Sequence, residues 1–245
     1  MPRQGWAAKG QKYTTKYIVL LVLGQRLFKG DFRTMTENFY HRYLNLPFDY
    51  PKPELFNDLS KDDRWVQKLD SDIIDDRFKT WIESLGLTMS NVIEGFYTKP
   101  GGASIPLHTD TSTIPGTVDL HPNDCCKLNF TWGPDDSTTR WYKIKDESKY
   151  IKLNIADHKA NKQFAPDFVP DIDIKYALLA EWEDVELVHE AVINRPSLLN
   201  ISQLHSTWNP SVDEPRWTLC FTLLDNGSIL TFNNSLEIFK NYIDS

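Results

Sequence analysis

Two side chains of types that bind transition metals stand close together in this sequence. His108 and Asp110 flank Thr109, and on an extended chain residues i and i+2 point to the same side. The imidazole and the carboxylate then converge on one point. Two ligands hold a metal only weakly, so this pair requires a third, and two histidines with one carboxylate form a set that suits Fe(II). The alternative is that this short triplet occurs by chance.

The other histidines offer one main candidate and one rival for the third ligand. His205 lies where two β-prone runs, LLNISQLHSTW and RWTLCFTLL, flank the polar turn NPSVDEP, and this pattern predicts a hairpin. His189 follows an apolar run that begins at Val185, and it is the rival. The remaining histidines stand in surroundings that indicate packing or solvated positions: His41, His121 and His158.

The predicted hairpin brings Arg216 near His205. With the turn in NPSVDEP, the two residues fall about opposite each other, and opposed residues of an antiparallel pair point to the same face. Along 216–224 polar residues alternate with bulky apolar ones, so the face that begins with Arg216 is polar. An inward-pointing guanidinium needs a carboxylate to offset its desolvation, and a dicarboxylate ligand would supply one, with Thr218 donating alongside. The alternative is an exposed Arg216 at the mouth of the hairpin.

Taken together, these residues resemble those of the iron(II)/2-oxoglutarate-dependent oxygenases. The family pattern is HxD, a distant His, and then Arg-x-Thr or Arg-x-Ser, which here reads HTD at 108–110, His205 and RWT at 216–218. The resemblance covers about residues 90 to 225 in motif order and strand pattern. The segments FYTKPGGASIPLHTD and LLNISQLHSTWNPSVDEPRWTLCFTLL also look like small oxygenases encoded by phages of marine bacteria.

The resemblance implies a mainly β fold, a double-stranded β-helix or cupin-like jelly roll with flanking helices, which holds the metal at one open end. It implies that His108, Asp110 and His205 bind Fe(II), and that Arg216 and Thr218 anchor 2-oxoglutarate. Dioxygen would be the cosubstrate, and hydroxylation of a small-molecule or peptide substrate is the expected reaction.

Two further residues are expected at the cosubstrate by analogy. Tyr97 looks like the strand tyrosine that contacts oxoglutarate in prolyl-hydroxylase-like members, and the alternative is a core aromatic. Asn129 shares a face with Lys127 and Thr131 in CKLNFTW, so it could project into the barrel, and the alternative is a solvent-facing strand residue. Prolyl hydroxylases carry a lysine where this chain has Arg216, which places the chain nearer other branches of the family.

Two other functions fit parts of this pattern. A cupin-type metalloenzyme without oxoglutarate would need the three metal ligands but not Arg216. A non-catalytic jelly-roll binding module would need neither, and could use aromatics such as Trp132, Trp141 and Tyr142 as a platform for carbohydrate or peptide. Neither accounts for the HxD triplet, His205 and Arg216 together, so the oxygenase is preferred.

The elements that must position these residues are mostly short strands. After Gly86, β-prone runs separated by Gly, Pro, Asn and Asp are typical of a sandwich or barrel. A helix is predicted from Ser71 with Gly86 just past its end, and a short closing helix from Ser235. The predicted strands are 91–98, 105–108, 116–120, 126–132, 139–144, 150–155, 175–180, 184–188, 197–201 and 216–224.

Length and composition indicate one folded domain. The chain has 245 residues, of which 40% are hydrophobic, and all-β domains reach this length without splitting. Within the single domain we expect an N-terminal cap over 1–70, a jelly-roll core over 90–225 and a closing segment over 226–245.

Charge and cysteine content narrow the partners and the compartment. A formal charge of -7 disfavours general nucleic-acid binding. The three cysteines, two of them adjacent, form no plausible disulfide framework, which indicates a reducing compartment. We therefore expect a cytoplasmic protein, which for a phage-encoded protein means the cytoplasm of the host. The apolar run Tyr17 to Leu23 is too short to span a membrane and is predicted to be a buried strand.

Overall fold

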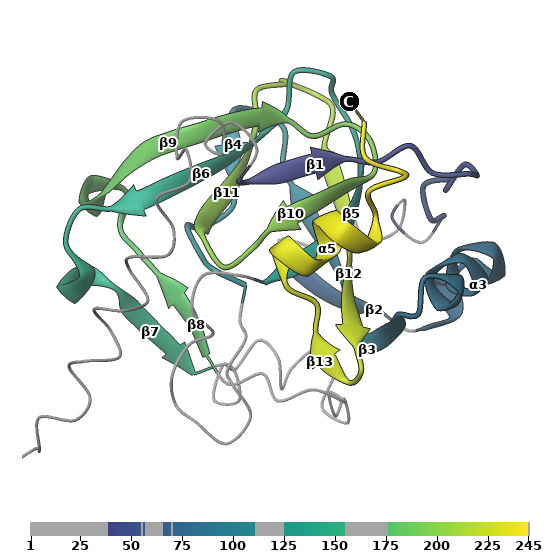
Figure 1. Cartoon of the computed structure of the whole chain (residues 1–245). Helices are drawn as coiled ribbons and strands as arrows, with labels where there is room; N and C mark the ends of the chain where they lie inside the picture. Colours follow the sequence, from purple (N-terminus) through teal and green to yellow (C-terminus); the bar gives the residue numbers. More distant parts are fainter. Residues whose placement is uncertain are drawn as a thin grey trace, which may run out of the picture. The chain divides into compact units, whose positions relative to one another are not determined.

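Antiparallel strands make up most of the described chain, which in this computed structural model comprises residues 39–54, 56, 66–69, 71–110, 125–154 and 176–244. The strands are β1 (His41–Tyr43), β2 (Val66–Leu69), β3 (Thr88–Thr98), β4 (Ala103–Ser104), β5 (Cys126–Trp132), β6 (Thr138–Ile144), β7 (Ile151–Asn154), β8 (Tyr176–Leu179), β9 (Val185–Val192), β10 (Ser197–Asn200), β11 (Leu204–Asn209), β12 (Arg216–Asp225) and β13 (Ser228–Ile229). The larger sheet has the order β1-β10-β5-β12-β3-β2, with β13 beside β12 (Figure 1). The smaller sheet has the order β4-β11-β6-β9, and β7 pairs with β8. The prediction of a mainly β fold is therefore confirmed.

The larger sheet is apolar on one face and polar on the other. In β12 the bulky side chains of Trp217, Leu219 and Phe221 belong to the main hydrophobic core. The intervening Arg216 and Thr218 line a pocket whose other side is formed by the smaller sheet. This division follows from the alternation of side chains along a strand. The polar face is the one that looks toward the smaller sheet.

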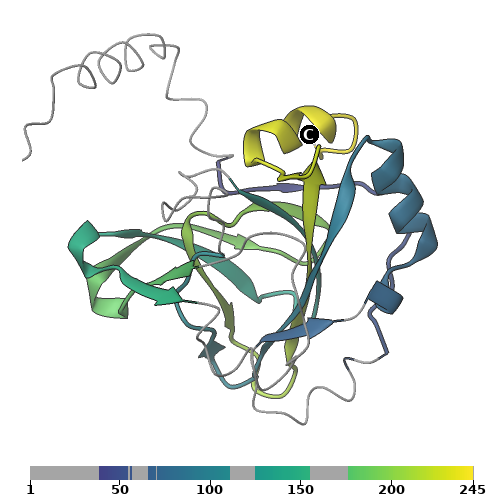
Figure 2. The ribbon, with the colours of Figure 1, turned by 90° about the horizontal axis from the view of Figure 1, so that it is seen from below.

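Helix α3 (Asp76–Ser84) packs on the apolar face of the larger sheet (Figure 2). It lies within the segment predicted to be helical but begins later than Ser71, because residues 71–73 form a separate 3-10 turn. The Asp75 carboxylate caps the helix by accepting a hydrogen bond from the backbone N–H of Arg77 at 2.8 Å. Gly86 follows the helix with φ +77°, a conformation that glycine adopts without strain.

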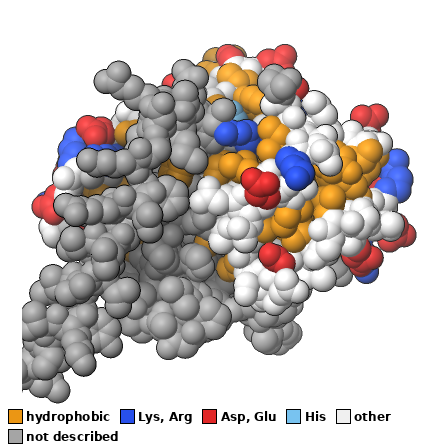
Figure 3. Space-filling view, viewed as in Figure 1, with side chains coloured by type: hydrophobic (Ala, Val, Ile, Leu, Met, Phe, Trp, Pro, Cys, Tyr) orange, Lys and Arg blue, Asp and Glu red, His pale blue; other side chains and the backbone are white. Residues whose placement is uncertain are grey.

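The closing helix α5 (Phe232–Ile238) begins before the predicted Ser235. Thr231 caps it by accepting a hydrogen bond from the backbone N–H of Asn234. Hydrophobic side chains gather on the described surface between α5 and α3 in Figure 3, where partly buried residues reach the edge of the main core. Two short 3-10 helices complete the described helical elements, Glu147–Lys149 and Trp182–Asp184.

Most strand predictions agree with the structure to within a few residues, and β5 matches 126–132. The strand predicted over 105–108 is wrong. Only Ala103–Ser104 forms a strand there, and His108 makes single bridges to Leu179 and His205. The runs 116–120 and 17–23 lie outside the described residues.

The hairpin predicted around His205 and Arg216 is also wrong. Strand β11 pairs with β4 and β6, whereas β12 pairs with β3 and β5. Residues 210–215 therefore carry the chain from one sheet to the other. His205 and Arg216 still face the same pocket, because the polar faces of the two sheets are turned toward each other.

Part of the expected N-terminal cap belongs to the larger sheet. β1 pairs with β10 at one edge, and β2 pairs with β3 at the other. The described residues from Tyr40 onward belong to one compact unit. No helix within the described residues is long and apolar enough to cross a membrane.

Candidate metal centre

The backbone holds His108 and His205 side by side. The N–H of His108 donates to the carbonyl of His205 at 3.1 Å, and the N–H of His205 donates back at 2.9 Å. Residues that exchange both hydrogen bonds point to the same face, and the centroids of the two imidazole rings lie 4.5 Å apart. The N–H of Asp110 donates to the carbonyl of Ile201 at 3.0 Å. This bond fixes the segment that carries the carboxylate.

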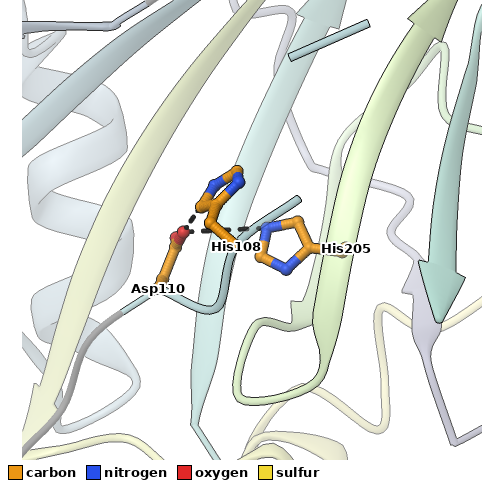
Figure 4. Close-up of side chains that lie close together, drawn as sticks. All are labelled: His108, Asp110 and His205. Carbon is orange, nitrogen blue, oxygen red and sulfur yellow. Dashed lines mark ion pairs between the residues drawn. The ribbon is translucent and has the colours of Figure 1, made fainter. Parts of the chain in front are cut away.

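Asp110 completes a cluster of three inward-facing side chains (Figure 4). Its Oδ1 atom lies 3.2 Å from Nε2 of His108 and 3.6 Å from Nε2 of His205. One ligand atom from each of the three residues lies within 4.8 Å of the others. All three side chains are nearly buried, so the cluster could hold a metal ion out of bulk water.

Each histidine has its other ring nitrogen tied to a backbone carbonyl. Nδ1 of His108 lies 2.8 Å from the carbonyl oxygen of Pro106, and Nδ1 of His205 lies 2.9 Å from that of Gln203. A carbonyl only accepts hydrogen bonds, so each Nδ1 carries a proton, and a neutral ring held in this way presents the lone pair of Nε2 to the cluster. Such an outer hydrogen bond orients metal-binding histidines.

The protonation states favour metal binding. Burial and the nearby His108 lower the pKa of His205 to about 4, so its ring is neutral at neutral pH. Burial alone would raise the pKa of Asp110, but Lys127 and the two histidines hold it well below its usual value. A neutral imidazole and an ionised carboxylate are the forms that bind metals.

Sequence reasoning missed two charged residues behind the cluster. Nζ of Lys127 lies 2.7 Å from Oδ2 of Asp110 and also forms an ion pair with Glu94. Burial alone would lower the pKa of Lys127, but both carboxylates raise it, so the amine stays charged. The signal in the sequence was the position of Lys127, which shares the inward face of β5 with Asn129.

Both sheets contribute side chains to the pocket at this cluster. Arg216 and Thr218 come from β12 and Asn129 from β5, all in the larger sheet. Apolar and small polar side chains lie around them. The complete lining is Phe96, Ile105, His108, Asp110, Asn129, Thr139, Leu199, His205, Thr207, Arg216, Thr218 and Cys220.

Arg216 is buried in this pocket without an anionic partner from the described chain. Arg216 is 1% exposed, and its Nη2 atom donates a hydrogen bond to Oγ1 of Thr139 at 3.0 Å. Its Nε atom is buried with no hydrogen-bond partner, and no described carboxylate forms an ion pair with the guanidinium. Burial lowers the pKa of Arg216 to about 10, so the group remains charged at neutral pH. The exposed Arg216 considered as an alternative is thereby excluded.

Gly133 allows the chain to pass close to Arg216. It has φ +141°, and a Cβ atom there would lie 2.8 Å from the carbonyl oxygen of Pro215 and 2.9 Å from Cα of Arg216. Any larger residue would have to displace the backbone at the start of β12. The glycine therefore helps to set the position of the guanidinium.

The other expected cosubstrate residues have different outcomes. Thr218 lines the pocket, and its hydroxyl lies 3.4 Å from that of Thr131. Asn129 also lines it, with a buried Oδ1 atom that has no hydrogen-bond partner. Tyr97 does not line the pocket, contrary to the expectation that it contacts the cosubstrate. It points to the opposite face of β3 from Phe96 and packs on Trp217, with ring centroids 4.6 Å apart. Tyr97 is therefore a core aromatic.

His189 is not brought to the cluster. In the smaller sheet it lies beyond Trp141, which stands between it and His205. Nε2 of His189 instead lies 3.2 Å from Nδ1 of His41, and burial and His189 lower the pKa of His41 to about 4. His121 and His158 lie outside the described residues.

Searches of protein-family models and of curated proteins found no match to the chain. The three inward-facing ligand candidates and the buried Arg216 are therefore interpreted from their own geometry.

Proposed function

We propose that this protein is a non-haem iron(II)- and 2-oxoglutarate-dependent oxygenase with a jelly-roll fold, most simply a hydroxylase. The observation that carries the proposal is a buried guanidinium without a carboxylate partner among the described residues, in the same pocket as two histidines and an aspartate. A metal alone explains the three ligand candidates. It does not explain Arg216.

The strand order supports a jelly roll. The central strands β10-β5-β12-β3 of the larger sheet face the smaller sheet β4-β11-β6-β9. From β3 to β6 the chain alternates between the two sheets, and from β9 to β12 it does so again in the opposite order. A jelly roll likewise has eight strands in two facing sheets, which supports this part of the proposal.

The donor set fits iron(II). Two imidazole nitrogens and one carboxylate oxygen on one side of a metal, with the remaining positions open, is the arrangement of non-haem Fe(II) oxygenases. Here the two Nε2 atoms and Oδ1 of Asp110 converge, and the open side faces the pocket. The hydrogen bonds from both Nδ1 atoms keep the rings in place for such a metal.

The other polar side chains of the pocket fit a dicarboxylate. Arg216 supplies a fixed positive charge with a planar set of donors, which suits a carboxylate better than a lysine would. Thr218 and Thr139 stand beside it with hydroxyl groups. A ligand with a metal-chelating keto acid at one end and a second carboxylate at the other would use both parts of the site. 2-Oxoglutarate has this chemistry.

The chain's own residues would orient and shield the reaction. With iron and oxoglutarate bound, the cofactors supply the chemistry that couples decarboxylation of the keto acid to hydroxylation of a substrate. Arg216 would fix the distal carboxylate and thereby the direction of the keto acid. Phe96, Ile105 and Leu199 line the same pocket and would keep bulk water from it.

The two alternatives account for less. A cupin-type enzyme without oxoglutarate would use the three metal ligands and leave a buried cation uncompensated, at a cost in stability. A binding module built on Trp132, Trp141 and Tyr142 lacks a common platform, because Trp141 is buried and Trp132 packs against the main core. Arg216 therefore separates the oxygenase from both.

Oxoglutarate is expected to stabilise the metal-loaded protein. A ligand that binds only the folded state, present at about 100 times its dissociation constant, adds about 2.7 kcal/mol, which corresponds to a shift of about 5–10 °C for a chain of this size. The measurement is thermal unfolding with Mn(II), with and without oxoglutarate. Pyruvate lacks the distal carboxylate and glutarate lacks the keto group, so both should give smaller shifts. If oxoglutarate does not raise the unfolding temperature of protein that is shown to bind Mn(II), the proposal is contradicted.

A further inference from the structure

We propose that Lys127 is a positioning residue that restricts Asp110 to binding the metal through one oxygen. This inference rests on the proposed metal site. By holding the second carboxylate oxygen, Lys127 would keep free the coordination position that a chelating cosubstrate needs.

The two oxygens of Asp110 have different environments. Oδ1 faces the Nε2 atoms of both histidines, at 3.2 Å and 3.6 Å. Oδ2 lies 2.7 Å from Nζ of Lys127. A charged amine at this distance is a strong hydrogen-bond donor. A carboxylate held in this way offers only Oδ1 to a metal.

Lys127 is itself held on its other side. Its Nζ atom forms an ion pair with Glu94, which lies on β3 of the same sheet. The side chains of Lys127 and Glu94 are 7% and 13% exposed, and Lys127 does not line the pocket. The amine therefore lies behind Asp110, and its own charge is offset without the metal.

The number of open positions makes this restriction consequential. Two imidazoles and one carboxylate oxygen leave three positions of an octahedral metal open. A keto acid takes two of them, and one remains for dioxygen. A carboxylate free to bind through both oxygens would occupy a fourth position and compete with these ligands.

A purely structural role for Lys127 would be to neutralise buried carboxylates. Such a role predicts similar effects from loss of Lys127 and from loss of Glu94, because both changes disturb the same ion-pair network. The positioning role predicts a difference. Glu94→Gln leaves Lys127 on Oδ2 of Asp110, whereas Lys127→Met releases that oxygen and nearly preserves side-chain length.

Co(II) provides a direct test, because its visible absorption and its X-ray absorption report the number and type of ligands. We expect Lys127→Met to change the spectrum of the Co(II)-loaded protein toward an additional oxygen ligand from the protein, and Glu94→Gln to keep the wild-type spectrum. Loss of an outer-shell contact commonly costs about 10–100-fold in metal affinity or activity. Competition from the second oxygen of Asp110 should therefore weaken oxoglutarate binding to Co(II)-loaded Lys127→Met by at least about tenfold.

A second variant keeps the test valid if Lys127→Met does not fold. Lys127→Met with Glu94→Gln leaves only the charge of Asp110, which the metal itself offsets, and it should show the same altered spectrum. Wild-type spectra and wild-type oxoglutarate affinity in both Lys127 variants would overturn the positioning role alone. Failure of the wild-type protein to bind Co(II) would instead overturn the metal site, and the inference with it.

Discussion

His205→Ala is expected to weaken the binding of Mn(II) or Fe(II) by more than about 100-fold, because the loss of even an outer-shell partner costs about 10–100-fold. His189→Ala should leave metal affinity unchanged. His189 contacts His41 and lies beyond Trp141 from the cluster. The measurement is a calorimetric titration of Mn(II) into metal-free wild-type protein and both variants.

His189→Ala is a matched control, because it also removes an imidazole from the smaller sheet, at a position aligned with His205 across Trp141. Thermal unfolding without metal would show whether each variant is folded. The assignment of His205 as the third metal ligand is wrong if His189→Ala abolishes metal binding and His205→Ala retains it.

Arg216→Ala is expected to weaken oxoglutarate binding by at least about a hundredfold. Removal of one side of a buried ion pair costs about 3–5 kcal/mol, and about 1.4 kcal/mol is a factor of ten. Mn(II) affinity should change little, because the guanidinium is not a ligand. Calorimetric titration of oxoglutarate into the Mn(II)-loaded proteins measures the effect.

Arg216→Lys should recover only part of the loss, since it restores the charge without the planar pair of donors. Because Arg216 is fully buried, thermal unfolding of both variants serves as the control for folding. Equal oxoglutarate affinities in the wild type and both variants would leave a metal site with no assigned cosubstrate. The cupin-type alternative would then be preferred.

Alternation in the sequence predicted which side chains face inward, but not which strands pair. The period of two along β12 and β5 placed Arg216, Thr218 and Asn129 on one face, and these residues do line the pocket. A polar turn between two β-prone runs looks the same whether it closes a hairpin or joins two sheets. The pairing of β11 with β6 depends on contacts across the fold, which no local pattern contains.

Local reasoning failed in a similar way at Tyr97 and Lys127. An aromatic in a strand is equally compatible with the pocket and the core. In this fold the main core lies on the face of the larger sheet that α3 covers, and Tyr97 points to that face. The sequence shows that Lys127 shares a face with Asn129, but its partners Asp110 and Glu94 come from distant parts of the chain. Buried ion pairs of this kind can be identified only from the tertiary structure.

Anaerobic titration of the Fe(II)-loaded protein with oxoglutarate, followed by visible absorption, tests the central claim most directly. Chelation of Fe(II) by a keto acid produces a charge-transfer band that neither component has alone. We expect this band to saturate at one oxoglutarate per Fe(II) in the wild type, and to be absent when His108→Ala protein is titrated in the same way. A protein that binds Fe(II) at His108, Asp110 and His205 but develops no band with oxoglutarate would contradict the assignment of this function.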